Sequence, residues 1–265
     1  MPVATFETAW VEFFARATLP GSETAARVFS HLGGEWFYLA LIPLLLWRGP
    51  WGTAVKVARA MIFADLAGEW IKWTLMRPRP PAELALSLET SPGFVSTHAA
   101  LSMAVGVVLY LSTREKRRVL LLVWILGVAW SRLRLGVHYP LDILGGWGLG
   151  LLVGIAASRW GGDRRAACLL SLAVGTLLAL LWPEGGQDSI ARDLGLLLGL
   201  EAGLLGRVYG SAEASPPERL PNRSLAVRTA GLIAIYFGFK AAGFPRLFRY
   251  FALGLWAVWR SRKKT

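Results

Sequence analysis

Long apolar runs recur along this chain, and they constrain its fold more than any other feature. A helix needs about 20 mostly apolar residues to cross a bilayer, because each residue adds about 1.5 Å. Runs that reach or approach this length cover residues 95–113, 119–130, 141–158, 166–182 and 194–209. Apolar residues make up 54% of the chain and charged residues only 17%. A soluble protein would not repeat such segments, so we predict an all-α, polytopic transmembrane helix bundle.

The chain divides into three parts by pattern. Residues 1–32 hold an amphipathic segment whose aromatic residues recur at helical spacing over 4–18, typical of a helix lying on a membrane. Residues 33–160 form the predicted catalytic transmembrane core, a bundle of the six-helix type with an outer loop after Leu75, where Pro78, Pro80 and Pro81 stop a helix. Residues 161–265 add C-terminal spans, at about 166–183, 191–209 and 225–243, and a basic tail. The stretch 246–260 either crosses the membrane or lies at its surface.

The net charge of +12 lies mainly in short connections between the apolar runs. Residues 114–118 and 159–165 are the clearest basic groups, and the positive-inside rule places them in the cytoplasm. The loops at 72–95 and 131–140 then face the periplasm or exterior of a cell (inner) membrane. The basic residues are not interleaved with stacking aromatics on one face, so we do not expect nucleic acid to be a partner. Cys168 is the only cysteine, which excludes an intramolecular disulfide.

Glycine repeats indicate close helix packing. Gly146, Gly150 and Gly154 recur every four residues, and a second series follows at 195, 199 and 203. Each series makes a groove in which another helix backbone can approach, either within the bundle or in a homodimer, with a role in substrate passage as the alternative.

Polar residues gather at the predicted outer ends of the spans, in a chain that otherwise avoids polarity. Ionisable groups at such positions are costly and point to function. His138 and Asp142 are one helical turn apart, so the carboxylate can hold one ring nitrogen and leave the other free to attack. His98 supplies a second imidazole, suited to protonating a leaving group. Cations and hydroxyls suited to a phosphoryl group come from Lys72, Arg79, Ser96, Thr97 and Arg132.

These residues carry a resemblance to a family. Lys72-x6-Arg79-Pro80, then Ser96-x-His98, then Ser131-Arg132-x5-His138-x3-Asp142 resembles the three-part signature of the type-2 phosphatidic-acid phosphatase superfamily. That superfamily includes bacterial lipid phosphatases, glucose-6-phosphatase and vanadium haloperoxidases. The resemblance implies that His138 forms a phosphohistidine, that Asp142 orients it and that His98 protonates the leaving group. It also implies that Lys72, Arg79, Ser96, Thr97 and Arg132 bind phosphate, with Arg77 able to assist.

The second motif departs from the family's usual Pro-Ser-Gly-His, because this chain has Val95-Ser96-Thr97-His98. The Ser-Thr-His-Ala order looks like the sphingosine-1-phosphate phosphatase branch, and the spans after residue 160 also fit that longer branch. Neither change removes a catalytic group.

Three further polar residues are predicted to be structural. Glu69 lies on the same helical face as Asp65 and Lys72, and we expect it to pair with Lys72, with a proton-relay role as the alternative. Glu201, in the middle of a glycine-rich helix, is expected to be buried and hydrogen-bonded. His31 is expected to lie at the membrane interface.

The sequence thus predicts an integral membrane lipid phosphate phosphatase that uses neither metal nor cofactor. The substrates considered are undecaprenyl diphosphate, phosphatidic acid, phosphatidylglycerol phosphate and long-chain base phosphates. A lipid phosphotransferase with the same phosphohistidine is one alternative, and a non-enzymatic lipid transporter is another.

Overall fold

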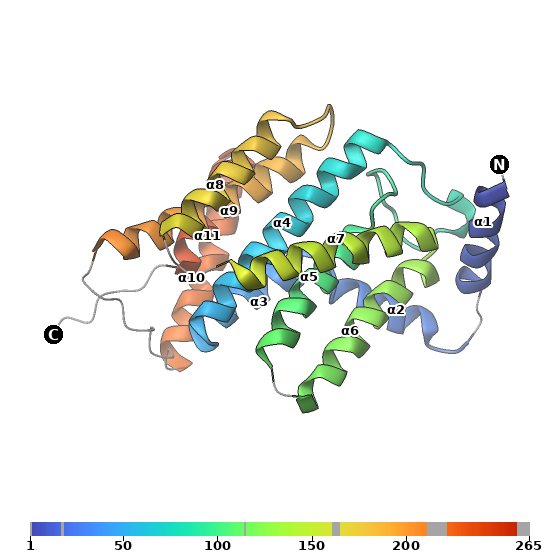
Figure 1. Cartoon of the computed structure of the whole chain (residues 1–265), viewed down its shortest axis with the longest axis horizontal. Helices are drawn as coiled ribbons and strands as arrows, with labels where there is room; N and C mark the ends of the chain where they lie inside the picture. Colours follow the sequence, from blue (N-terminus) through green and yellow to red (C-terminus); the bar gives the residue numbers. More distant parts are fainter. Residues whose placement is uncertain (1, 17–18, 114, 161–164, 211–221, 259–265) are drawn as a thin grey trace.

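A computed structural model describes residues 2–16, 19–113, 115–160, 165–210 and 222–258, and within these ranges the chain is helical with no strand. The elements are α1 (Pro2–Ala15), α2 (Ser22–His31), α3 (Glu35–Arg48), α4 (Trp51–Leu75), a 3-10 turn at Ala82–Leu84, α5 (Thr97–Ser112), α6 (Glu115–Arg134), α7 (Pro140–Arg159), α8 (Arg165–Leu180), α9 (Gln187–Gly210), α10 (Asn222–Ala241) and α11 (Arg246–Val258). The all-α prediction is confirmed. Figure 1 shows α1 at one end of the long axis and α8 to α11 toward the other.

Helix boundaries near the outer loop follow local rules. α4 ends at Leu75, and Met76 caps it with a left-handed backbone (φ 49°) just before Pro78. α7 begins with Pro140 in its first turn, where a missing backbone N–H costs nothing. The backbone N–H of Tyr139 donates to Asp142 Oδ2 at 2.8 Å, so this carboxylate also caps α7.

The N-terminal region differs in detail from the pattern-based division. The chain before Glu35 forms two helices, and α2 meets α3 with a bend of 50° at the Leu32–Gly34 break. In α1 the aromatic side chains Phe6 and Phe13 are exposed, whereas Glu7 is buried at 4% exposure. Helix α1 therefore packs Glu7 inward and presents Phe6 and Phe13 outward. The three-part division itself remains a prediction.

α5 and α7 are in close backbone contact, as the first glycine series predicts. A Cβ atom added at Gly146, Gly150 or Gly154 would lie 2.5, 2.3 or 2.8 Å from the carbonyl oxygens of Ser96, Ala100 and Ala104, respectively. Since real side chains cannot come so close, only glycine permits this spacing. This glycine series thereby sets the distance between the start of α5 and the start of α7.

The second glycine series packs α9 against α11. A Cβ at Gly195 would lie 2.4 Å from the Leu247 carbonyl oxygen, and one at Gly199 would lie 2.1 Å from that of Phe251. Packing within the chain is confirmed for both glycine series.

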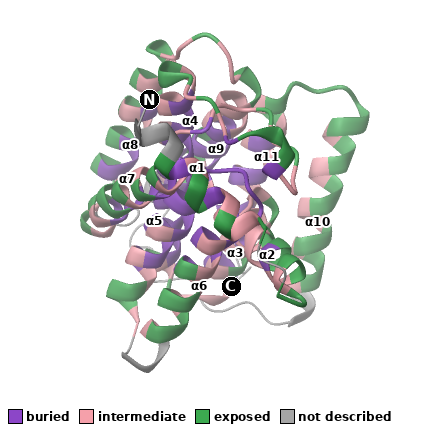
Figure 2. Ribbon diagram, turned by 90° about the vertical axis from the view of Figure 1, so that its right-hand side faces the viewer, coloured by how far each residue is buried: buried purple, intermediate pink, exposed green. Residues whose placement is uncertain are grey.

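α4 runs through the centre of the bundle, where buried residues concentrate (Figure 2). It carries two buried charged contacts to α9. Arg59 forms a two-pronged ion pair with Glu201, at 2.8 Å from each carboxylate oxygen, and both side chains are fully buried. Nearer the outer loop, Asp65 pairs with Arg192, which also contacts Glu35 and Asp193. The prediction that Glu201 is buried and hydrogen-bonded is confirmed.

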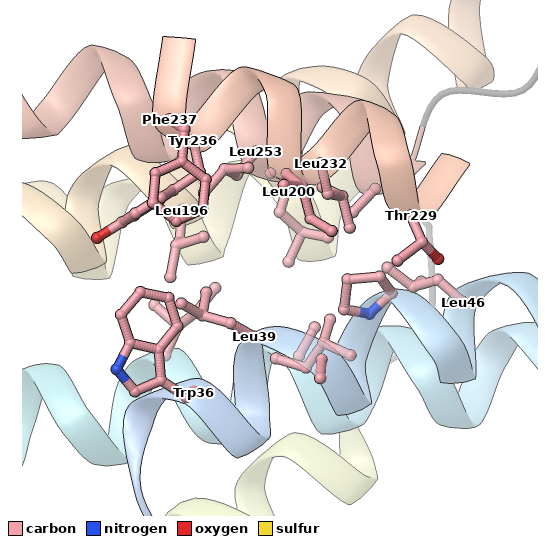
Figure 3. A pocket seen from close by; sticks show the side chains of 18 residues that line it. Trp36, Leu39, Leu46, Leu196, Leu200, Thr229, Leu232, Tyr236, Phe237 and Leu253 are labelled. Atoms are coloured by element: carbon pink, nitrogen blue, oxygen red, sulfur yellow. The ribbon is translucent and has the colours of Figure 1, made fainter. Parts of the chain in front are cut away.

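α10 packs loosely beside the rest. Over Leu225–Ala241 none of its residues is buried, and Figure 2 shows it standing at the side of the bundle. Between it, α3, α4, α9 and α11 lies an apolar cavity of about 300 Å³, with Trp36, Leu200 and Tyr236 among its lining residues (Figure 3). None of the eight predicted site residues lines this cavity.

By length and composition alone, one described helix can span a membrane, namely α7, and the bent pair α2–α3 gives a second. α5 and α8 are apolar but shorter, at 16 residues each. α4 has the length, but Lys56, Arg59, Asp65, Glu69 and Lys72 reduce its mean hydropathy. The orientation prediction depends on basic residues in the connections. Many of them lie outside the described residues, including Arg114, Arg164, Arg219 and Arg260.

Candidate active site

The eight residues singled out from the sequence meet at one end of the bundle. The C-terminal turn of α4 supplies Lys72, and the following loop supplies Arg79. The start of α5 carries Ser96, Thr97 and His98, and the end of α6 carries Arg132. His138 lies in the connection before α7, and Asp142 lies in the first turn of α7. Segments up to 70 residues apart in the sequence thus form one polar cluster.

His138 contacts a carboxylate with one ring nitrogen and a guanidinium group with the other. Its Nδ1 lies 3.4 Å from Asp142 Oδ2, and its Nε2 lies 3.3 Å from Arg79 Nη1. These partners favour the tautomer with the proton on Nδ1 and a lone pair on Nε2. The ring is only 1% exposed. Burial first, and then the charges of Arg132, Arg79 and Lys72, lower the pKa of His138 well below its ordinary value. The imidazole is therefore neutral at neutral pH, and its Nε2 keeps a lone pair.

Asp142 is fixed on both oxygens. Oδ2 accepts the backbone N–H of Tyr139 at 2.8 Å, and Oδ1 accepts Arg77 Nη1 at 2.5 Å. Arg77 also pairs with Glu7 of α1 and stacks over the Tyr139 ring at 5.0 Å. Arg77 thus contacts the orienting carboxylate, whereas Arg79 contacts the histidine. The two arginines have separate positions although only Pro78 lies between them.

Lys72 sits among oxygens at the start of α5. Its Nζ lies 3.0 Å from Glu69 Oε1, 3.2 Å from Ser91 Oγ and 3.3 Å from Thr97 Oγ1. The predicted Glu69–Lys72 pair is confirmed. Gly68, one turn earlier, lets Thr97 approach, because a Cβ there would lie 2.9 Å from Thr97 Cγ2. Lys72 is 3% exposed, so its charge is available only to a group that enters the cluster.

Residues 89–91, in the loop between α4 and α5, contact both Arg79 and Arg132. Arg79 donates to the Ser91 carbonyl at 2.6 Å and to the Val137 carbonyl at 2.8 Å. Arg132 donates to Ser30 Oγ at 2.6 Å and forms an ion pair with Glu89. The same carboxylate lies 3.9 Å from Arg79. Burial would raise the pKa of Glu89, but Arg132 and Arg79 outweigh it and hold that pKa below its ordinary value.

The start of α5 presents the remaining groups. The Ser96 backbone N–H donates to the Asp142 carbonyl oxygen at 2.9 Å, which joins the two motif segments. Ser96 Oγ is buried and has no hydrogen-bond partner among the described residues. His98 packs against the α2–α3 bend, where a Cβ at Gly34 would lie 3.6 Å from His98 Nε2. His98 is half-buried. The Ser96 backbone and the Thr97 hydroxyl of this turn thus contact cluster residues, whereas the His98 ring lies against the α2–α3 bend.

Four polar contacts of the cluster were not singled out from the sequence. Glu89 and Ser91 come from the outer loop, Ser30 from α2 and Glu7 from α1. They have no helical spacing to the motif residues, so sequence pattern gave no signal for them. His31 is exposed, and its interfacial placement remains a prediction.

Two histidines, an aspartate and a set of Lys and Arg side chains thus lie together at one end of a helical bundle, and such cations suit a phosphoryl group. Residues 53–166 match the PAP2 superfamily, and this stretch contains all eight site residues. The chain is 34% identical over 161 residues to the decaprenylphosphoryl-5-phosphoribose phosphatase of Mycobacterium tuberculosis, covering 56% of this chain and 85% of that protein. The chain belongs to the PAP2 superfamily.

Two other relatives are matched over a smaller part of their length. The undecaprenyl-diphosphatase of Sulfolobus acidocaldarius is 31% identical over 133 residues, which covers 46% of this chain and 62% of that protein. Human sphingosine-1-phosphate phosphatase 2 is 29% identical over 126 residues, covering 43% of this chain and 32% of that protein. The chain therefore spans less than two thirds of the length of these two relatives. All three relatives are named as phosphatases of lipid-linked phosphates.

Two solved structures share the fold. The transmembrane PAP2-type phosphatidylglycerolphosphate phosphatase of Bacillus subtilis superposes with a TM-score of 0.52 at 24% identity, over 59% of this chain and 84% of that chain. LpxE of Aquifex aeolicus superposes with a TM-score of 0.51 at 20% identity, over 57% of this chain and 93% of that chain. This chain shares the fold of both structures, and about two fifths of this chain lie outside each superposition.

Proposed function

We propose that this chain is a multi-pass integral membrane phosphatase that hydrolyses a lipid phosphomonoester or diphosphate at the outer membrane face. The observation that carries the proposal is the position of His138. One ring nitrogen is backed by Asp142, and the other faces Arg79 beside Lys72 and Arg132. A nucleophile with an orienting acid, facing a group of cations, is the arrangement that phosphoryl transfer needs.

The reaction proceeds in two displacements. His138 Nε2 attacks phosphorus as the bond from phosphorus to the lipid-bearing oxygen breaks, and His98 gives its proton to the leaving oxygen. The resulting phosphohistidine is attacked by water. Deprotonated His98 takes a proton from that water, the nitrogen–phosphorus bond breaks and inorganic phosphate leaves. Asp142 holds the Nδ1 proton throughout and stabilises the positive charge that develops on the ring.

Charge on the phosphoryl oxygens is balanced by protein side chains. Lys72, Arg79 and Arg132 surround the position that Nε2 faces, with Ser96 and Thr97 at the N-terminus of α5. Helix N-termini and guanidinium groups both favour oxyanions. These groups supply the electrostatic role that a metal ion has in other phosphatases, so we propose that turnover needs no metal.

The membrane placement follows from charge and exposed surface. The site lies where α4 and α6 end and where α5 and α7 begin, whereas Arg48 and Arg159 lie at the opposite ends of α3 and α7. The positive-inside rule puts that opposite end in the cytoplasm and the site outside. Large apolar side chains on α6 are exposed to the surroundings, including Val119, Leu120 and Leu126 at 62%, 70% and 55%. Such a surface fits lipid contact, with a catalytic core followed by further C-terminal spans.

The substrate class draws on the relatives. Their names specify an undecaprenyl diphosphate, a decaprenylphosphoryl sugar phosphate and sphingosine 1-phosphate. All three are molecules with a terminal phosphate and a long hydrophobic group. We propose the same class here, with prenyl-linked and long-chain base phosphates tested beside phosphatidic acid and phosphatidylglycerol phosphate.

The deciding experiment measures phosphate release from this lipid panel by the purified full chain in detergent, with chelator and no acceptor lipid. Wild type and His138→Ala are compared. Chelator-resistant release that is lost in the variant supports the proposal. Phosphate transfer that requires an acceptor lipid would indicate a phosphotransferase. No turnover on any lipid by a folded protein would move the assignment toward a transporter.

A further inference from the structure

The cations of the site already bind an anion that belongs to the protein. Glu89 forms an ion pair with Arg132, and its other carboxylate oxygen lies 3.9 Å from Arg79 Nη2. Two residues further along, Ser91 Oγ contacts both Lys72, at 3.2 Å, and Arg79, at 3.1 Å. The loop segment 89–91 therefore supplies oxygen acceptors to all three cations assigned to phosphate. A phosphoryl group that enters must replace these acceptors.

Glu89 differs from a structural ion pair in its setting. Arg132 is 1% exposed, but the Glu89 side chain is 26% exposed and comes from a loop rather than from a helix. Its neighbour Leu88 is 92% exposed, so the loop tip is not packed into the bundle. Glu69, by contrast, pairs with Lys72 from the same helix. Glu89 can thus leave the arginines without disturbing a helix, and solvent is available to the carboxylate when it leaves.

We propose that Glu89 is a specificity-determining residue: an internal carboxylate that occupies the phosphate-binding arginines and yields only to a ligand of higher charge. The inference rests on the proposed phosphatase function and adds a selection step to it. A carboxylate has one negative charge and two oxygens. A phosphomonoester has a charge of about −1.5 to −2 and three terminal oxygens at neutral pH, so it is the stronger ligand.

Glu89 excludes phosphodiesters from the phosphate-binding arginines. The phosphate of a bulk phospholipid links two groups, so it has one negative charge and two free oxygens. It matches the carboxylate in charge and gains nothing by replacing it, while Glu89 is already tethered at the site. An enzyme embedded in phospholipid meets such headgroups in great excess over its substrate. A competing internal anion lowers affinity for every phosphate, but it removes the weaker ligands from competition.

The test compares Glu89→Gln with wild type and with Glu83→Gln in the full chain in detergent. Glu83 lies on the same loop and is exposed, so its change removes the same charge away from the arginines. For Glu89→Gln we expect the KM for a lipid phosphomonoester to fall about three- to tenfold, with kcat changed less than about twofold. Phosphatidylglycerol in the mixed micelles should inhibit this variant at ratios that leave wild type and Glu83→Gln unaffected.

A binding measurement separates this inference from the proposed function. Stabilisation by orthophosphate or vanadate, followed as a shift in melting temperature, needs no turnover. Tighter binding by Glu89→Gln in a protein that hydrolyses no lipid would support the internal anion and reject the phosphatase. An unchanged or weaker affinity in folded Glu89→Gln, repeated in Glu89→Ala, would overturn the inference. An equal gain in Glu83→Gln would also overturn it, because the effect would then be general electrostatics.

Discussion

Two groups of buried cations include residues of α4. They are similar in composition but differ in which segments supply their carboxylate partners. Near the start of α4, Arg59 uses both prongs on Glu201, and neither side chain is exposed. Near its end, Lys72 joins Arg79 and Arg132, whose shared carboxylate, Glu89, comes from a partly exposed loop. The first pair joins two helices. The second group is assembled from two helices, α4 and α6, and the loop that follows α4.

The two groups differ in whether their charged side chains can still bind a ligand. A buried ion pair that is fully matched has no capacity left for a ligand, and its main consequence is the cost of breaking it. The site cluster holds three cations that share carboxylates from Glu69 and Glu89, with a neutral histidine facing them. These three cations can therefore still bind an added anion. Substitutions in the two groups should therefore change different observables.

The largest effect is expected at the nucleophile. His138→Gln should lower kcat by about four orders of magnitude or more, because the covalent route is lost and only binding groups remain. The melting temperature should change by no more than a few degrees. Phosphate release and thermal unfolding of the same preparations measure both quantities. Retention of a tenth of the activity would remove His138 from the mechanism.

The Arg59–Glu201 ion pair should show the opposite result, a large loss of stability with little change in activity. Glu201→Leu leaves Arg59 buried with its main carboxylate partner removed, so we expect a loss of about 3–5 kcal/mol in stability. The activity per folded molecule should stay within about twofold of wild type, since Glu201 does not contact the site. Combining it with Arg59→Met should restore much of the melting temperature. A double variant as unstable as the single one would show that the pair is more than a matched ion pair.

The orienting carboxylate should have an intermediate effect. Asp142→Asn keeps an oxygen for Tyr139 but loses the charge behind His138, so kcat should fall about a hundredfold. KM should change little, because Asp142 does not contact the phosphate. Arg77→Gln should shift kcat in the same direction by less, because Arg77 acts only through Asp142. A larger loss for Arg77→Gln than for Asp142→Asn would contradict this order and give Arg77 a direct role.

Glycine substitutions extend the comparison to backbone packing. Gly146→Ala places a Cβ 2.5 Å from the Ser96 carbonyl and must move α5 relative to α7, at a cost of about 1–3 kcal/mol. Activity should fall together with stability, because Ser96 and His98 move away from His138. Gly199→Ala, on the α9–α11 contact, should lower the melting temperature only. Gly148→Ala is the control, since nothing lies within 4 Å of its Cβ.

The smallest effect is expected from pH. The pKa of His138 in the folded chain is well below 6.5, mainly because the ring is buried. Below pH 6.5 the unfolded chain binds a proton that the native site does not, so stability falls as pH falls. Between pH 7.5 and 5.5 wild type should lose about 1–3 °C more in melting temperature than His138→Gln. Equal losses in both proteins would show that the ring is not buried as a neutral group.

Motif spacing predicted the site better than it predicted the environment of the site. Asp142 backs His138 one turn away, and Glu69 pairs with Lys72, because both contacts are local to one segment. Motif spacing selects Arg79 over Arg77 for phosphate, and Arg79 is the arginine that lies beside His138. Its role in binding phosphate stays a prediction. The bend between α2 and α3 had no comparable signal, since Leu32–Gly34 carries no breaker stronger than a glycine pair.

By itself the sequence determined the helical architecture, the glycine contacts and which polar residues lie together. Hydrophobic periodicity, four-residue glycine repeats and motif spacing are local properties of the chain. Only the tertiary structure decided what surrounds those residues. Glu89, Ser91 and Glu7 come from a loop and from α1, and Glu7 contacts Arg77 and the Leu141 backbone, 70 and 134 residues away. Such contacts depend on how helices pack and where a loop without periodicity folds back, and no local pattern encodes that geometry.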